Sequence, residues 1–161
     1  MDYRTIIKVD FREYDRRTLE KSREWFKDPE LRKLTVTPEI DIESQEKWFL
    51  SLKDRKDYFI KSVWRDNEPI AVIGIKSITP IDGEVWGYIG EKKYWGKAIG
   101  IDMMNFILDY AASIGLSSVY SKSLKSNLAT YKINRRFGFI VEKELEDGKI
   151  LMRYYIKQTA D

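Results

Sequence analysis

The chain has 161 residues, 43% of them hydrophobic and 14% aromatic, which is enough apolar material for one folded domain and excludes a disordered chain. Its 29 basic and 26 acidic side chains give a net charge of +3, which excludes the strongly basic surface typical of nucleic-acid-binding proteins. Cysteine and histidine are both absent, which excludes disulfides, thiol nucleophiles, Ser-His-Asp triads and most catalytic zinc sites.

No apolar run is long enough to cross a bilayer, and no apolar stretch follows Met1–Arg4 as it would in a secretory signal. We therefore expect a cytoplasmic protein with no membrane contact, no bound metal and no nucleic-acid partner. Any catalysis must use carboxylates, tyrosines, lysines, backbone groups or a cofactor that carries its own reactivity. An acyl thioester is such a cofactor, because its activated carbon arrives with the ligand.

The N-terminal part of the chain predicts a strand followed by two helices. Its features are, in chain order, a strand at Arg4–Val9, a helix that Asp15 or Thr18 caps and Asp28-Pro29 ends, a loop at Thr35–Pro38, and a helix that Asp41 caps.

The rest of the chain predicts strands interrupted by two helices. Its features are strands at Tyr58–Trp64, Ile70–Ile75 and Glu84–Gly90, a helix that includes Ile101–Ala112, a strand at Leu116–Ser123, a helix at Asn127–Phe137 ended by Gly138, and strands at Phe139–Leu145 and Lys149–Ile156. Asp82-Gly83 and Asp147-Gly148 predict tight hairpin turns. We see no repeat and no linker in residues 1–161, so we expect a single α/β domain.

A loop with several small residues lies at Gly96–Gly100, between a predicted strand and the start of a helix. Such a loop exposes free backbone N–H groups at the positive end of the helix dipole, and small residues let the backbone approach an anion. The loop therefore predicts a phosphate-binding site. The alternative is a strand-to-helix turn in which glycine only serves tight geometry.

A second stretch, Asn127–Phe139, reads as a helix headed by asparagine and ended by Gly-Phe. Together the two stretches resemble the GCN5-related N-acetyltransferase (GNAT) family, whose phosphate loop is written Gln/Arg-x-x-Gly-x-Gly/Ala. Tyr94–Lys97 is most similar to the branch that includes ribosomal-protein N-terminal, spermidine and nucleotide-amino-sugar acetyltransferases. The resemblance covers nearly the whole chain. It implies a mixed, mostly antiparallel sheet of about seven strands, flanked by about four helices and splayed between the fourth and fifth strands.

The resemblance implies acetyl-CoA as co-substrate. The pantetheine arm would thread the gap between the splayed strands, and a backbone amide near Tyr88 or Ile89 would hold the thioester carbonyl. The pyrophosphate would bind the amides of the small-residue loop. Asn127 would lie beside the pantetheine, or serve as a helix cap, or both. The residues so implied to bind the cofactor are Tyr88, Ile89, Trp95, Gly96, Lys97, Ala98, Ile99, Gly100, Ile101, Asn127 and Arg136.

The resemblance leaves the catalytic groups open. Many relatives carry tyrosine as general acid at the position of Asn134, and asparagine is not a proton donor of that kind. Tyr131, one helical turn earlier, or Tyr94 is an alternative donor, and the CoA thiol is itself acidic enough to leave largely as thiolate. Glu84 or Glu91 could relay a proton through water as the base, unless each is simply an exposed carboxylate at a strand end.

The same considerations bear on the acceptor. Deprotonating an alkyl amine at neutral pH costs roughly 4.6 kcal/mol, against roughly 1 kcal/mol for an α-amine, so a site without histidine favours a less basic amine such as that of a sugar. Because side chains alternate along a strand, Trp86 and Tyr88 share a face with Glu84, which would give an acceptor wall suited to stacking on sugars or nucleobases. Trp25 and Trp86 are our candidates for acceptor contact, although aromatic residues are by default part of the core.

We therefore predict direct acetyl transfer from acetyl-CoA to a primary amine, with a nucleotide-linked amino sugar of bacterial surface-glycan biosynthesis as the leading acceptor. The alternatives are a protein N-terminus or a polyamine, the latter disfavoured by the excess of basic over acidic residues. A CoA-binding module without catalysis is an alternative of another class, motivated by Asn134. We expect a monomer or a homodimer, in which the final hairpin could pair between subunits.

Overall fold

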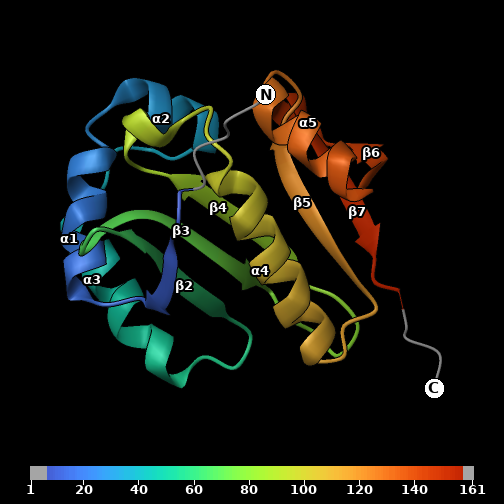
Figure 1. The fold of residues 1–161 in the computed structure, drawn as a ribbon, viewed down its shortest axis with the longest axis horizontal. Coiled ribbons are helices and arrows are strands. Elements are labelled where there is room, and N and C mark those ends of the chain that lie inside the picture. The colour runs from blue at the N-terminus through green and yellow to red at the C-terminus, as the bar shows by residue number, and fades with distance from the viewer. Residues whose placement is uncertain (1–6, 158–161) are drawn as a thin grey trace.

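The computed structural model of the protein describes residues 7–157 and shows a seven-stranded sheet with helices on both faces (Figure 1). The strands are β1 (Asp10–Glu13), β2 (Phe59–Arg65), β3 (Glu68–Lys76), β4 (Glu84–Ile89), β5 (Ser118–Leu124), β6 (Ile140–Glu144) and β7 (Lys149–Tyr155). The α-helices are α1 (Arg16–Trp25), α2 (Pro29–Thr35), α3 (Ile42–Ser51), α4 (Ile99–Ser113) and α5 (Leu128–Phe137).

The sheet is split near its middle. Its strand order is β1-β2-β3-β4-β5-β7-β6, and every neighbouring pair is antiparallel except β4 and β5. These two strands run parallel and are joined at one residue pair, Glu84 and Tyr120, after which their ladder stops. The predicted mixed sheet, with its split between the fourth and fifth strands, is confirmed.

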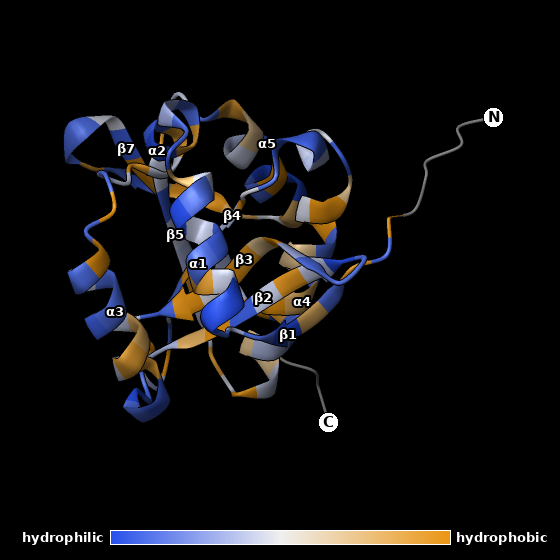
Figure 2. Ribbon diagram, turned by 90° about the vertical axis from the view of Figure 1, so that its left-hand side faces the viewer, coloured by the Kyte–Doolittle hydropathy of each residue, from blue (hydrophilic) through white to orange (hydrophobic). Residues whose placement is uncertain are grey.

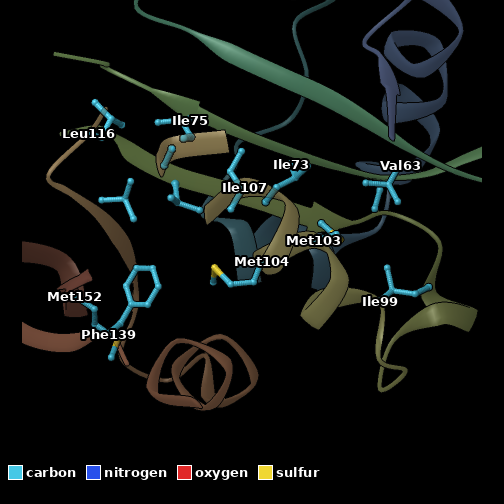
Figure 3. Close-up of a cluster of buried hydrophobic side chains, with 14 of the residues drawn as sticks. Val63, Ile73, Ile75, Ile99, Met103, Met104, Ile107, Leu116, Phe139 and Met152 are labelled. Carbon is cyan, nitrogen blue, oxygen red and sulfur yellow. The ribbon is translucent and has the colours of Figure 1, made fainter. Parts of the chain in front are cut away.

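Alternation along β3 places a core on each face of the sheet. Ile73 and Ile75 point to the face that α4 covers, where they pack with Met103 and Ile107 of that helix (Figure 3). Val72 points to the opposite face, into a smaller cluster with Trp25, Phe26 and Leu31. Figure 2 shows a largely hydrophobic β3 beside a mostly hydrophilic α1.

The predicted helix ends are largely confirmed. Asp15, Asp41 and Asn127 each accept a hydrogen bond from a backbone N–H in the first turn of the helix that follows them. Gly138 ends α5 with a φ of 101°, a left-handed value that glycine adopts without a Cβ clash.

The position predicted for the first strand is wrong. Residues 7–9 are irregular, residues 4–6 lie outside the described range, and β1 begins only at Asp10. Pairing with β2 decides the position, since Asp10 lies opposite Trp64 and Glu13 lies opposite Lys61. The weak alternation of residues 4–9 does not reveal which residues pair with β2, so it could not locate the strand.

Helix α2 was not predicted. We interpreted Asp28-Pro29 as the end of a helix, and it is also the start of the next, because Asp28 caps α2 and Pro29 takes its first position. The helix has 7 residues, too few to show a helical period. Burial of Leu31 at 3% exposure holds it against the sheet.

One of the two predicted hairpin turns is confirmed. Asp147 and Gly148 have φ values of 60° and 73°, as a tight turn of this kind requires. The tight turn predicted at Asp82-Gly83 is wrong. These two residues are only the end of a longer connection, residues 77–83, between β3 and β4. Gly83 is needed there for another reason: a Cβ on it would lie 2.6 Å from the Ile75 side chain.

Candidate active site

A cavity of about 1050 Å³ lies along the split between β4 and β5. Residues of α2, the α2–α3 loop, β4, β5, the start of α4 and the first part of α5 line it. Trp86 and Tyr88 reach it from the face that α1–α3 cover, whereas Met103 and Met104 reach it from the α4 side. Side chains from both faces of the sheet therefore line the cavity.

The start of α4 is unlike the starts of the other described α-helices, because no side chain caps it. The capping residues of the others are Asp15, Asp28, Asp41 and Asn127. Four backbone N–H groups at this start donate to no acceptor within residues 7–157. They belong to Gly96, Ala98, Ile99 and Gly100. Free N–H groups at the positive end of a helix dipole are suited to a phosphate-like anion.

The glycines of this loop leave the approach to the cavity open. Gly96 has a φ of 74°, which favours glycine, and no atom of the described chain lies within 4 Å of where its Cβ would be. Gly100 meets only the tip of Ile133 at 3.0 Å. Both glycines line the cavity, so the free amides lie at its edge.

Backbone amides of β4 alternate between the neighbouring strand and the split. The Gly90 N–H donates to the Ile70 carbonyl at 2.9 Å, which makes these opposed residues a hydrogen-bonded pair. By alternation the Tyr88 N–H also points to β3, and the Ile89 N–H points to the split. The Trp95 indole N–H fixes this end of β4 by donating to the Ile89 carbonyl at 2.7 Å.

Polar side chains of β5 and α5 form the opposite wall of the split. Asn134 is 2% exposed, and its Nδ2 lies 3.2 Å from Ser121 Oγ and 3.7 Å from Met152 Sδ. The Ser123 hydroxyl is buried and has no hydrogen-bond partner among the described residues. Asn127 caps α5 and reaches back to the Leu34 carbonyl at 3.5 Å.

Besides Trp95, six aromatic side chains line the cavity, and these six form an aromatic wall on the side of α1–α3 in which neighbouring ring centroids are 4.8 to 6.4 Å apart. They are Tyr14, Phe26, Trp48, Tyr58, Trp86 and Tyr88. Burial raises the pKa of Tyr58 to about 12 and raises the pKa of Tyr14 and of Tyr88 well above the usual phenol value. These hydroxyls are therefore neutral at physiological pH and offer hydrogen bonds rather than a base.

Glu84 lines the cavity beside two lysines. Its side chain is 12% exposed, and its carboxylate lies 3.5 Å from Lys76 Nζ and 3.8 Å from Lys122 Nζ. Both lysines also line the cavity. Each oxygen of the carboxylate is therefore ion-paired with one of the two lysines.

The structure brings most of the predicted site residues to the cavity. Those that line it are Glu84, Trp86, Tyr88, Ile89, Trp95, Gly96, Gly100, Asn127 and Asn134. Lys97, Ala98, Ile101 and Arg136 do not line it. Ile99 is also absent from the lining, because its side chain is 1% exposed and packs in the core against the sheet.

Trp25 was predicted to contact the acceptor, but it does not line the cavity. Its indole N–H donates to Glu91 Oε1 at 3.0 Å, and its ring packs so closely on Gly90 that a Cβ there would lie 2.0 Å from it. Trp25 meets Tyr88 edge-on, with ring centroids 6.0 Å apart, so it supports the aromatic wall from behind. Glu91 is correspondingly held by Trp25 and by Lys21 at 3.4 Å, outside the cavity.

The two alternative tyrosine donors also lie elsewhere. Tyr131 and Tyr94 both pack against the main hydrophobic core, and neither lines the cavity.

Several residues that line the cavity were not predicted from the sequence. Tyr14 follows β1 and Tyr58 precedes β2, far from either recognised stretch. Ser121 and Ser123 are ordinary strand residues until β5 is seen to border the split. Ser121 and Ser123 are two residues apart, so they share one face of β5. The sequence does not say whether that face borders a cavity or solvent, because it does not locate the split.

Two features are absent from the described part of the chain. No cluster of His, Cys, Asp or Glu side chains within residues 7–157 could hold a metal ion. Among the described helices, none has the length and apolar character that crossing a membrane would need.

Comparison with known proteins places this geometry in context. Residues 8–140 match the family model of the acetyltransferase (GNAT) domain. The uncharacterized protein MJ1062 of Methanocaldococcus jannaschii is 27% identical over 95 residues, which are 57% of this chain. The match spans only 19% of that longer protein.

Solved structures share the fold at low sequence identity. A domain from Methanocaldococcus jannaschii superposes with a TM-score of 0.82 at 21% identity, over 92% of this chain and 98% of that one. Campylobacter jejuni N-acetyltransferase PseH in complex with acetyl coenzyme A has a TM-score of 0.71 at 20% identity, over 93% and 100%. Vibrio cholerae spermidine N-acetyltransferase in complex with CoA and spermine has a TM-score of 0.77 at 16% sequence identity, over 92% of this chain and 95% of that one.

Proposed function

The chain belongs to the GNAT acetyltransferase family, whose members use acetyl-CoA, and from this premise we propose where the donor binds and which amine receives the acetyl group. The observation that carries the proposal is the continuity of the free amides at the start of α4 with the cavity in the β4–β5 split. A long, narrow donor with a diphosphate at one end and a thioester at the other fits such a path.

The donor lies in the split, with its pyrophosphate on the free amides from Gly96 to Gly100. Those N–H groups and the α4 dipole offset the negative charge without a dedicated basic side chain. Lys97 and Arg136, both exposed, add positive charge near the nucleotide end. Ala98 has a φ of −75°, so the site needs no left-handed backbone at this position, where the family usually has glycine.

The thioester carbonyl accepts a hydrogen bond from the Ile89 N–H. Of the two amides predicted for this role, that of Tyr88 is directed to β3 and that of Ile89 to the split. A main-chain donor fixed by a strand is already oriented before the negative charge develops on the oxygen. The amine then attacks the carbonyl carbon directly, and the C–S bond breaks without a covalent enzyme intermediate.

The acceptor is a primary amine on a ring system, and our leading candidate is a nucleotide-linked amino sugar, as in bacterial surface-glycan pathways. Flat rings stack on an aromatic wall of this size, and the neutral tyrosine hydroxyls on it can hydrogen-bond to sugar hydroxyls. Lys76 and Lys122 offer positive charge to the phosphates of such an acceptor. The same two lysines disfavour a polyamine.

The proposal is tested by measuring the rate at which free CoA thiol is released from acetyl-CoA in the presence of each of a panel of amines. UDP- and dTDP-linked amino sugars are expected to release CoA faster than spermidine or peptides with a free N-terminus. Turnover of peptides alone would replace the sugar acceptor with a protein N-terminus. Tight acetyl-CoA binding by calorimetry, with no turnover of any amine, would support the non-catalytic binding module instead.

A further inference from the structure

Gly74 and Trp86 lie opposite each other on the neighbouring strands β3 and β4. A Cβ on Gly74 would lie 3.0 Å from Trp86 Nε1 and 3.1 Å from Trp86 Cε2, so the indole occupies the space that a side chain at this position would fill. The same Cβ would lie 2.5 Å from the Phe59 carbonyl oxygen, so β2 also requires this glycine. The absence of a side chain at Gly74 therefore lets the Trp86 indole pack directly against the sheet.

The nitrogen of this indole is not accessible from the cavity. Trp86 lines the cavity, but its Nε1 is buried and has no hydrogen-bond partner among the described residues. The atoms that the ring presents to the cavity are therefore carbon atoms. A flat hydrocarbon surface of this kind binds another ring by stacking and offers it no hydrogen bond.

Positive charge lies beside the exposed face of the indole. Glu84 precedes Trp86 by two residues, so its side chain is on the same face of β4. The Glu84 carboxylate holds Lys76 Nζ at 3.5 Å and Lys122 Nζ at 3.8 Å, and both lysines line the cavity. This part of the cavity therefore suits a flat ring that carries an anionic group close to it.

The flat ring on Trp86 is remote from the reacting amine. In the proposed function, acetyl transfer takes place at the Ile89 amide. Trp86 precedes Ile89 by three residues in β4, a separation of about 10 Å along the strand. A single amino-sugar ring stacked on Trp86 would leave its amine short of the thioester. The ring that stacks there is therefore a second ring of the acceptor.

We propose that Trp86, positioned by Gly74, stacks on the nucleobase of a nucleotide-linked acceptor and determines the preference of the enzyme for such an acceptor. The proposal rests on the proposed function and names the residue that recognises the part of the acceptor farthest from the amine. The anionic linkage next to the nucleobase lies beside Lys76 and Lys122. Because the indole donates no hydrogen bond to the cavity, stacking does not distinguish one base from another.

Acceptors with and without the base test the proposal in the wild type. The kcat/KM for a UDP-linked amino sugar is expected to exceed that for the same amino sugar 1-phosphate by at least about 10-fold, and a dTDP-linked sugar is expected to match the UDP-linked one within about threefold. Equal kcat/KM with and without the base would overturn this inference and leave the proposed function in place. A wild-type protein that acetylates no amino sugar of either kind would overturn both.

Trp86→Leu tests the residue itself. It is expected to remove most of the preference by lowering kcat/KM for the UDP-linked sugar about 10-fold. Trp64→Leu is the matched control, because Trp64 is also a tryptophan with a buried, unpartnered Nε1 among the described residues but does not line the cavity. Trp64→Leu is expected to keep the wild-type preference, a ratio that does not depend on how much of the protein is folded. A wild-type preference in Trp86→Leu would overturn the assignment.

A double variant tests whether Gly74 positions the indole. Gly74→Ala is expected to reduce the preference and to lower the Tm, and the fall in Tm is expected to be smaller in the Trp86→Leu background, where the contact of the new Cβ with the indole is removed. An equal fall in both backgrounds would assign the need for glycine to the Phe59 carbonyl alone and overturn the positioning role.

Discussion

At the scale of single residues, Val36 has an unusual backbone. It ends α2 with φ 52° and ψ 45°, the left-handed region, where β-branched side chains clash with the main chain. Of the described non-glycine residues with positive φ, it is the sole β-branched one. Val36 also lines the cavity, so the strained position lies at the candidate site.

We expect Val36→Gly to stabilise the protein by about 0.5 to 1 kcal/mol, because relief of the left-handed strain exceeds the entropy that glycine adds to the unfolded chain. Urea unfolding measures the change. Val141→Gly is the matched control, since Val141 is similarly exposed but lies in β6, where glycine should destabilise. Destabilisation by both changes would show that Val36 is not strained.

Gly100 gives a second prediction at this scale. A tyrosine at this position would project from the first turn of α4 into the space where we place the pyrophosphate. Gly100→Tyr is expected to weaken acetyl-CoA binding by at least about 10-fold in calorimetry. Ala112→Tyr, at an exposed site on the same helix, controls for the added side chain, and equal affinity of the two variants would count against the loop site.

At the scale of elements, Glu46 joins α3 to α1. Its carboxylate binds Arg16 at 2.6 Å and Arg23 at 2.8 Å, and these hydrogen bonds lower the pKa of Glu46 from 4.5 to about 2. A depressed pKa in the folded state means that the ionised form stabilises the fold above pH 4.5. This stabilisation is lost as the pH falls from 4.5 toward 2.

We therefore expect Glu46→Gln to lower the free energy of unfolding at pH 6 and to differ progressively less from the wild type below pH 4.5. Denaturant midpoints measured at several pH values between 2 and 7 would show this convergence. Glu43→Gln is the control on the same helix, because Glu43 makes only an exposed contact with Lys47 at 3.8 Å. A difference that did not depend on pH would assign the effect to packing.

At the scale of the whole molecule, the split divides the sheet into two parts. β1 to β4 form one ladder and β5 to β7 another, joined at Glu84 and Tyr120 and by the main hydrophobic core, which contains residues of α4 and of both ladders. A donor in the split would hydrogen-bond to β4 and contact β5 and α5. Its binding should therefore stabilise both parts together.

Acetyl-CoA at 100 times its dissociation constant is expected to stabilise the fold by about 2.7 kcal/mol, by mass action alone. Thermal unfolding with increasing acetyl-CoA measures this shift. Hydrogen exchange should slow at the amides of Gly96–Gly100 and Ile89 and change little in β1. Protection confined to the surface of α1 would place the ligand elsewhere.

Most elements were predictable because their signals are local. The capping side chains of Asp15, Asp41 and Asn127, the glycine that ends α5 and the apolar run of β3 each act within a few residues. The elements that were missed depend on distant partners. β1 is positioned by pairing with a strand about fifty residues away, and α2 by the burial of Leu31.

The amino-acid sequence alone determined the family, the free-amide loop and the absence of histidine and cysteine chemistry, because these depend on residue identity and short-range geometry. Only the tertiary structure decided which groups face one another across the split. It moved Trp25 behind the aromatic wall, turned the Tyr88 amide away and brought Ser121 to Asn134. The direction of a side chain or an amide toward a shared space is set by how strands pair and diverge, and that is a property of the whole sheet.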